Sequence, residues 1–212
     1  MEDVLDVYAR PYDAFHPVVC LDEKSKELHA PVREPLRPQQ GMPLRVDSEY
    51  VRNGVANLFL WVEPLAGRRG VQVTQRRCAT DFALLLRHLS DEVYAAAHNI
   101  VMVCNNLNTH GPHCLYEAFP PKQAHRLAGR FEWHFTPEHG SWLNIAECEL
   151  SVLSRQCLKR RIADQETLRR EAAAWEAERN AAATTIDWQF TTADARVKLR
   201  RLYPVVKVQG ST

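Results

Sequence analysis

VVCLDE, residues 18–23, is a short apolar run that ends in two carboxylates. The β-branched valines and the proline before them favour a buried strand over a helix. The pattern therefore places Asp22 and Glu23 at the carboxyl end of a strand.

A second apolar run, Ile100 to Val103, closes at Cys104 and opens into the polar sequence NNLNTH at residues 105–110. Polar loops at the carboxyl ends of strands are common places for a functional site. Asn105 is the first residue of this loop.

Three further strands are expected. Residues 57–62 and 71–74 indicate a hairpin, because the connection between them is rich in glycine and proline. Residues 131–136 alternate apolar and polar side chains, which is the pattern of a half-buried strand, and Pro137 ends it.

Helices are expected where apolar side chains recur at helical spacing. They cover residues 80–93, 142–158, 165–183 and 193–202, and a helical stretch links the strands before and after it in the region 111–130. Thr80, Ser141 and Asp164 are the expected N-caps of the first three, because their side-chain oxygens can accept hydrogen bonds from free backbone N–H groups. This order of elements predicts an α/β fold with a mixed central sheet flanked by helices.

Length and composition suit a single domain over residues 1–212, with a sizeable core. No apolar run approaches the roughly 20 residues that cross a bilayer, and residues 1–12 carry acids where a signal peptide would carry lysines. We therefore expect a cytoplasmic protein with no membrane partner.

The six cysteines form no CxxC pair, which argues against a disulfide framework or zinc module. Residues 30–47 are rich in proline and should form an extended loop.

The formal net charge is only +1, so any contact with nucleic acid must be local. Basic residues cluster at several points, and these clusters could lie along DNA phosphates or simply form solvated faces. The clusters expected to contact DNA comprise Arg76, Arg77, Lys159, Arg160 and Arg161.

Three polar residues stand at the ends of expected elements: Asp22, Asn105 and Glu147. Carboxylates gathered at neighbouring strand ends make an oxygen-lined site for hard cations such as Mg²⁺. Two such ions about 4 Å apart can activate a water or a 3′-hydroxyl and stabilise a leaving oxygen. The alternative is that charged residues at strand ends are merely solvated.

Three long strings in the chain resemble bacterial insertion-sequence transposases of the mariner superfamily, in the order and spacing of that family. They are VVCLDEKSKEL, IVMVCNNLNTHGPHCLYEAF and FEWHFTPEHGSWLNIAECELSVLSRQCL. The likeness runs from about Asp13 to Pro204. It implies the catalytic core of a DDE transposase, with a ribonuclease H-like fold and with Asp22 and Glu147 as catalytic metal ligands.

The chain departs from the family pattern at the second aspartate, where Asn105 stands. Asparagine keeps one carbonyl ligand but replaces the other oxygen by an NH₂ donor, so the negative charges fall from three to two. Metal-dependent catalysis should therefore be weakened. A deliberate substitution and the natural decay of a transposon copy explain the asparagine equally well.

Several residues around these three are further candidates. Glu149 is the second choice for the acidic ligand, because it projects near the middle of the apolar stripe of its helix. The groups expected around the ligands are Glu23, Asn106, His110 and His139. The two histidines could orient water or contact phosphate, although loop histidines often only form surface hydrogen bonds.

The resemblance implies cleavage of DNA at transposon ends and transfer of a 3′-hydroxyl to target DNA, with two Mg²⁺ or Mn²⁺ ions. The implied partners are double-stranded DNA, namely the transposon ends and the target, and a second copy of the chain in the DNA complex; the implied location is the bacterial cytosol and nucleoid. Family members bind their ends through helix-turn-helix segments ahead of the core, and we expect that region to be absent here. The alternative function is a catalytically silent module that binds DNA or an active transposase.

Overall fold

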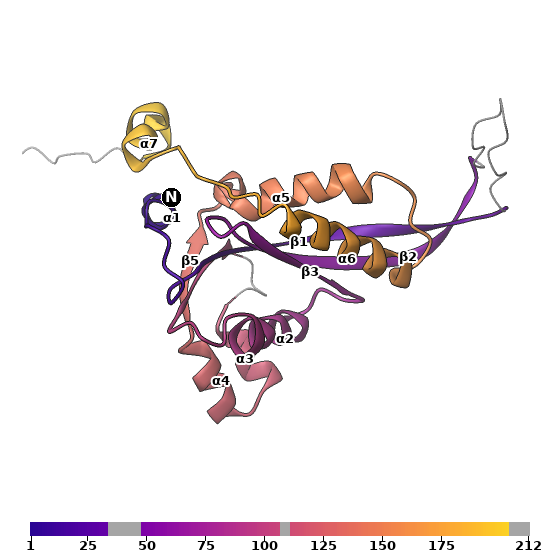
Figure 1. Cartoon of the computed structure of the whole chain (residues 1–212), viewed down its shortest axis with the longest axis horizontal. Helices are drawn as coiled ribbons and strands as arrows, with labels where there is room; N and C mark the ends of the chain where they lie inside the picture. The colour runs from indigo at the N-terminus through magenta and orange to yellow at the C-terminus, as the bar shows by residue number, and fades with distance from the viewer. Residues whose placement is uncertain (34–47, 107–110, 204–212) are drawn as a thin grey trace, which may run out of the picture.

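The computed structural model describes residues 1–33, 48–106 and 111–203. Its centre is a five-stranded sheet in the order β3-β2-β1-β4-β5 (Figure 1). The strands are β1 (Val18–Pro31), β2 (Tyr50–Glu63), β3 (Arg68–Thr74), β4 (Ile100–Asn105) and β5 (Phe131–Thr136). The α-helices are α1 (Glu2–Tyr8), α2 (Ala79–His88), α3 (His113–Ala118), α4 (Pro121–Ala128), α5 (Ile145–Leu153), α6 (Gln165–Ala181) and α7 (Thr192–Lys198).

The sheet mixes both kinds of pairing, as the sequence predicts. β1 pairs with β2 and β2 with β3 in antiparallel fashion, whereas β1 with β4 and β4 with β5 are parallel. Parallel neighbours need a crossover, and the helices between β3 and β4 and between β4 and β5 supply it. The carboxyl ends of β1, β4 and β5 therefore point in the same direction.

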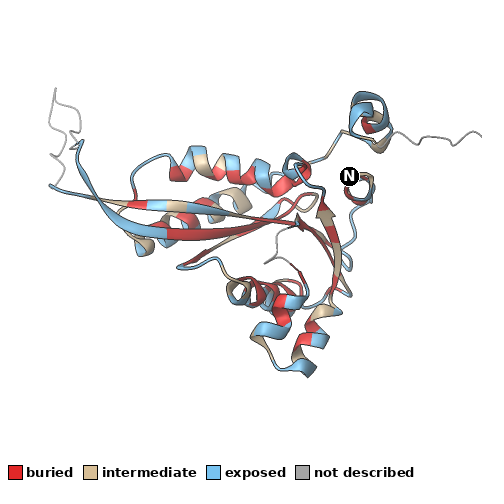
Figure 2. Ribbon diagram, turned by 180° about the vertical axis from the view of Figure 1, so that it is seen from behind, coloured by how far each residue is buried: buried red, intermediate tan, exposed pale blue. Residues whose placement is uncertain are grey.

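Each face of the sheet has its own core, because successive side chains of a strand point to opposite faces. Helices α5 and α6 cover one face, and α2, α3 and α4 cover the other (Figure 1). The helices bury the sides that face the sheet and expose the others (Figure 2).

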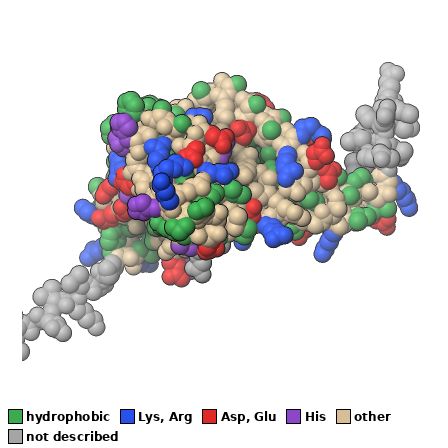
Figure 3. Space-filling model, turned by 90° about the horizontal axis from the view of Figure 1, so that it is seen from below, with side chains coloured by type: hydrophobic (Ala, Val, Ile, Leu, Met, Phe, Trp, Pro, Cys, Tyr) green, Lys and Arg blue, Asp and Glu red, His purple; other side chains and the backbone are tan. Residues whose placement is uncertain are grey.

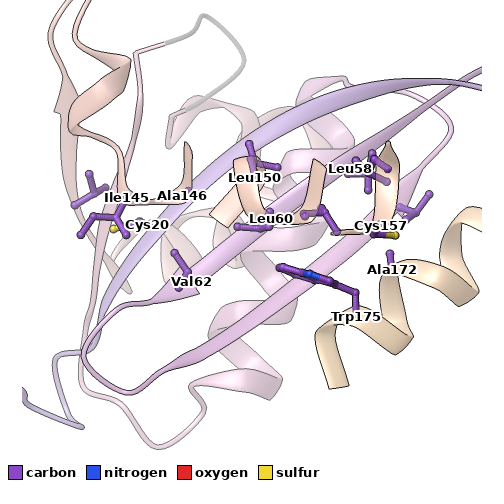
Figure 4. Close-up of a cluster of buried hydrophobic side chains, with 14 of the residues drawn as sticks. Cys20, Leu58, Leu60, Val62, Ile145, Ala146, Leu150, Cys157, Ala172 and Trp175 are labelled. Carbon is purple, nitrogen blue, oxygen red and sulfur yellow. The ribbon is translucent and has the colours of Figure 1, made fainter. Parts of the chain in front are cut away.

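The core beneath α5 and α6 decides where the start of α5 lies. Cys20 of β1 and Leu60 and Val62 of β2 pack against side chains of α5, including Ile145 and Leu150 (Figure 4). Since Glu147 stands in the same helix, this packing holds it above the sheet.

The first two strands are much longer than the sequence predicts. β1 and β2 have 14 residues each, and beyond the other strands they continue as a two-stranded ribbon (Figure 1). The side chains of this ribbon are mostly exposed, so it lacks the apolar run by which a buried strand is recognised. Of the expected loop 30–47, Ala30 and Pro31 belong to β1, and residues 34–47 lie outside the described residues.

Two expected helix starts are wrong, and one is confirmed. Helix α2 is capped by Cys78 rather than Thr80, because the Asp81 carboxylate accepts from the Cys78 backbone N–H at 3.3 Å. The α-helix expected from residue 142 begins instead at Ile145, and Asn144 rather than Ser141 caps it. Asp164 caps α6 as expected, accepting from the Thr167 N–H at 2.7 Å.

The stretch expected as one helix over 142–158 is divided into three parts. A 3₁₀ turn, Ser141–Leu143, precedes α5, and a π-helical turn, Ser154–Leu158, follows it. The helix expected over 165–183 ends at Ala181, and the C-terminal one is shortened to α7 with a 3₁₀ turn after it. Helix α1 was not expected; its seven residues are held by the burial of Val4, Leu5 and Val7.

All six cysteines are free thiols in this structure. Within residues 1–33, 48–106 and 111–203, no helix has the length and apolar character needed to cross a bilayer.

Candidate functional site

Asp22, Asn105 and Thr136 lie in a row across the three parallel strands. Asn105 and Thr136 are the last residues of β4 and β5, whereas Asp22 and Glu23, predicted at a strand end, lie within β1 just past its pairing with β4. In the register, Leu21 lies opposite Cys104, and Asn105 lies opposite Thr136. Asp22 points to the same face as Cys20, and Asn105 to the same face as Val103, so both face the core beneath α5. The strand register thus brings together two of the three predicted residues.

Asp22 is 3% exposed, which is unusual for a carboxylate. Its Oδ1 accepts from the Glu23 backbone N–H at 2.8 Å and from the Asn105 amide at 3.1 Å. Its Oδ2 is buried and accepts no hydrogen bond from any residue that the structure describes. Burial and, after it, the neighbouring Glu147 carboxylate raise the pKa of Asp22 to about 7.

Glu147 stands in the first turn of α5, three residues after the cap Asn144. Its side chain is exposed, but its carboxylate lies close enough to Asp22 to repel the ionised form and to accept a hydrogen bond from the protonated form. The structure therefore brings Glu147 to Asp22, as the sequence predicts.

Asn105 lies between Asp22 and Thr136. Its Nδ2 donates to Asp22, while its Oδ1 accepts from the Thr136 hydroxyl at 3.0 Å and from the Asn144 amide at 3.5 Å. The NH₂ group consequently faces the Asp22 carboxylate, at a position where an aspartate would place a second charged oxygen.

Glu149 does not face this group, contrary to its place as second choice for the ligand. It is buried, as its position in the apolar stripe predicts, but it pairs with two arginines: Arg179 donates to its Oε1 at 2.7 Å, and the Arg69 Nε lies 3.3 Å from its Oε2. Side chains two positions apart in an α-helix differ by about 200° in direction, so Glu147 and Glu149 project to opposite sides. Glu149 therefore serves a buried ion cluster that joins α5, α6 and β3.

An open cavity of about 510 Å³ adjoins Asn105. It is lined by Asn105, Asn106, Thr136, Pro137, Glu138, His139 and Ser141. His139 has φ 59°, in the left-handed region that non-glycine residues rarely adopt, and its side chain is 93% exposed. Two residues expected around the ligands, Asn106 and His139, thus border the same space.

The other two residues expected around the ligands have different outcomes. The Glu23 carboxylate pairs with Arg77 at 3.1 Å, directly beside Asp22 in sequence. His110 lies outside the described residues.

The basic residues expected to contact DNA are partly engaged within the protein. Arg160 pairs with Glu171, and Arg161 donates to the Ser48 carbonyl at 2.8 Å and lies over the ring of Tyr50. Arg76 and Lys159 are exposed. On the face formed by α2, α3 and α4, lysine and arginine side chains are interspersed with acidic ones and histidines (Figure 3).

The oxygen ligands available for a hard cation are the Asp22 carboxylate, the Glu147 carboxylate and the Asn105 carbonyl. The Asp22 Oδ2, which accepts no hydrogen bond from the described residues, and the nearby carboxylate of Glu147 fit one divalent ion, since their two negative charges match its charge. Within the described part of the chain, no group of three or more His, Cys, Asp or Glu side chains is arranged to hold a metal ion. Asn105 carries an amide where an aspartate would supply a third carboxylate.

The sequence profile of the DDE superfamily endonuclease family matches residues 17–169. The chain belongs to this family. The match covers β1 to the start of α6, and so includes Asp22, residue 105 and Glu147. No curated protein matches the chain.

Solved transposase structures share the fold. A pre-cleavage Mos1 transpososome aligns over 85% of this chain, with a TM-score of 0.53 and 15% sequence identity. The Mos1 strand transfer complex aligns over 82% of this chain, with a TM-score of 0.55 and 16% identity. The Mos1 mariner paired end complex with Mn aligns over 85% of this chain, with a TM-score of 0.54 and 16% identity. The likeness confirms the ribonuclease H-like fold. The alignments cover 58%, 51% and 55% of those chains, so this chain spans little more than half their length.

Two residues of the site, Asn144 and Thr136, were not singled out in the sequence. Asparagine directly before a helix is a known cap signal, but Ser141 competes with it three residues earlier. Thr136 gave no signal beyond its place as the last residue of an alternating strand.

We predict that Glu149→Gln lowers the free energy of unfolding by about 3–5 kcal/mol, because it leaves Arg69 buried without its counter-charge. Glu147→Gln is the matched control in the same helix, and it should not lower that free energy, since the side chain is exposed and faces another carboxylate. Urea unfolding followed by tryptophan fluorescence measures both. Equal losses would contradict the separate roles of the two glutamates.

We further predict that Asp22 makes stability depend on pH. Its pKa is about 7 in the folded chain against 3.8 ordinarily, so between these values the folded chain keeps a proton that the unfolded chain has lost. The stabilisation that comes from this retained proton is fully present below pH 3.8 and is lost as the pH rises through about 7. In metal-free buffer, Asp22→Asn should therefore be more stable than the parent at about pH 8 but not at about pH 4. A difference independent of pH in urea unfolding would contradict this.

Proposed function

We propose that this chain is the catalytic core of a transposase that cleaves DNA at transposon ends and transfers a 3′-hydroxyl to target DNA. We propose also that Asn105 weakens this metal-dependent activity. The proposal rests on the gathering of Asp22, residue 105 and Glu147 beside the parallel strands, with one Asp22 oxygen buried and without a hydrogen-bond donor among the described residues. Membership of the DDE superfamily endonucleases supports the nuclease chemistry.

In the proposed reaction, Asp22, Glu147 and the residue at 105 hold Mg²⁺ or Mn²⁺, two ions in the fully active form. Bound metal would supply an activated water or 3′-hydroxyl and would stabilise the leaving oxygen. Solved relatives include Mos1 mariner paired end complexes with Mn and with Mg. We choose Glu147 over Glu149 as the third ligand, because the Glu149 oxygens are taken by Arg69 and Arg179.

Asn105 weakens the site in two ways. It removes one negative charge, so two carboxylates face the four positive charges of two divalent ions. It also turns a hydrogen-bond donor toward Asp22, and the donor occupies Oδ1. The remaining ligands suit a single ion better than a pair.

The DNA is proposed to lie over the cavity beside Asn105. Arg76 and Arg77 are the main phosphate contacts in this proposal, because Arg77 pairs with Glu23 next to Asp22. Lys159, Arg160 and Arg161 contribute less in this proposal, since Arg161 binds the Ser48 carbonyl just before β2, whereas Asp22 pairs with Leu60 near the other end of that strand. Two transposon ends must be paired in the reaction, so a homodimer on DNA is proposed, acting in the bacterial cytosol.

A second candidate function is a catalytically silent module that binds DNA or an active transposase. The hydrogen bond from Asn105 to Asp22 favours it, because it partly satisfies the buried carboxylate without a cation.

We predict that Asn105→Asp increases DNA nicking in Mn²⁺ by about 100-fold or more, since even groups around a metal ligand change activity by about 10–100-fold. The assay compares the parent and the variant on labelled duplexes that carry the terminal repeats of the parent element. Asn105→Asp combined with Glu147→Gln is the control and should not nick.

Two outcomes separate the candidate functions. Equal nicking by the parent and by Asn105→Asp would show that residue 105 is not a metal ligand. Nicking by neither, with DNA binding intact, would favour the silent module.

We predict that Arg76→Ala and Arg77→Ala each weaken binding to duplexes of any sequence and lower the slope of log affinity against log salt by about 1. Arg196→Ala is a control of the same type, because Arg196 is exposed on α7 and pairs with Glu2. Fluorescence anisotropy over a range of salt concentrations measures these slopes. If the slope is unchanged in Arg76→Ala and Arg77→Ala, the proposed position of the DNA beside these two residues is wrong.

A further inference from the structure

Asn144 joins all three elements that carry the proposed metal ligands. It is completely buried. Its Nδ2 donates to the Leu21 carbonyl in β1 at 2.9 Å and lies 3.5 Å from the Asn105 Oδ1 of β4, while its Oδ1 accepts from the Ala146 N–H at the start of α5. One side chain thus spans the residue before Asp22, the residue at 105 and the turn that carries Glu147.

Thr136 approaches the same oxygen from the other side. It lies opposite Asn105 in the parallel ladder and is 3% exposed, and its hydroxyl donates to the Asn105 Oδ1 at 3.0 Å. Two buried donors therefore converge on a single oxygen of residue 105. Such a pair of donors suits the oxygen of a carboxylate even better than that of an amide, because hydrogen bonds to a charged acceptor are stronger.

The two donors decide which terminal atom of residue 105 faces Asp22. The oxygen must stay with Thr136 and Asn144, so the other atom, now Nδ2, is turned toward the Asp22 carboxylate. With aspartate at 105, that other atom is an oxygen, and it faces Asp22 as a second ligand.

We propose that Asn144 and Thr136 are positioning residues for the metal ligands, and that they retain in this chain a donor pair suited to a carboxylate at position 105. This inference rests on the proposed function. Its consequence is that Asn105→Asp should complete a site that is otherwise already built. A purely structural role, in which Asn144 only caps α5, would affect stability but not metal affinity.

The test measures Mn²⁺ affinity in the Asn105→Asp chain by the electron paramagnetic resonance signal of free Mn²⁺, with the melting temperature recorded for every variant. Asn144→Ser keeps a good cap residue but is too short to span β1 and β4. Thr136→Val removes the hydroxyl and keeps the shape, and Thr136→Ser restores the donor. Asp164→Ala removes the cap of α6, away from the site, and controls for loss of a cap.

We expect Asn144→Ser and Thr136→Val each to weaken Mn²⁺ binding by about 10–100-fold, the range measured for groups that orient metal ligands. Thr136→Ser should recover most of the affinity. Asp164→Ala should lower the melting temperature and leave the affinity within about twofold of its parent, since a cap contributes to helix stability alone.

Two results would overturn the proposal, and they differ. If the Asn105→Asp chain binds Mn²⁺ and folded Asn144→Ser and Thr136→Val bind it equally well, the positioning role is wrong and the proposed function stands. If Asn105→Asp binds no Mn²⁺ at all, the metal-dependent function fails and the positioning role fails with it.

Discussion

The parallel ladder of β1, β4 and β5 is the constraint on which the rest of the site depends. Because β4 and β5 end beside the point where β1 leaves the parallel pairing, residues far apart in the chain become neighbours, and the alternation of side chains sends Asp22, residue 105 and Thr136 to one face. The same alternation buries the apolar residues before them, so packing of the core stabilises the strand register that positions the three polar residues. A shift of one residue in any of the three strands would turn its polar group to the opposite face.

A buried carboxylate needs a compensating partner, and the neighbourhood of Asp22 offers two kinds. One is the amide of Asn105, which donates to one Asp22 oxygen, while the second oxygen has no donor among the residues that the structure describes. The other is the cation that we propose Asp22 and Glu147 would hold together. The pKa of Asp22 is raised because burial and the neighbouring Glu147 carboxylate disfavour its charged form. Residue 105 therefore provides one hydrogen bond to the buried carboxylate and, in our proposal, limits the activity of the site.

Two successive turns of helix α5 are attached to other elements of the fold. The cap Asn144 ties its first turn to β1 and β4, and the buried pairs of Glu149 with Arg69 and Arg179 tie its next turn to β3 and α6. Glu147 lies between these two attachments and is itself exposed. Its position is therefore determined by neighbours that do no chemistry, which is how a rigid scaffold presents a ligand at a defined place.

Local periodicity and the family strings were enough to predict β4, the apolar start of β1 and the trio Asp22, Asn105 and Glu147 as candidate ligands, because both signals lie in short stretches of the sequence. The length of β1, whose exposed half has no apolar signal, and the separate contacts of Glu147 and Glu149 became visible only in the folded chain. The same is true of the hydrogen bonds made by Asn144 and Thr136. Their hydrogen bonds join residues 31 to 123 positions apart, and no local pattern records a contact made across a sheet.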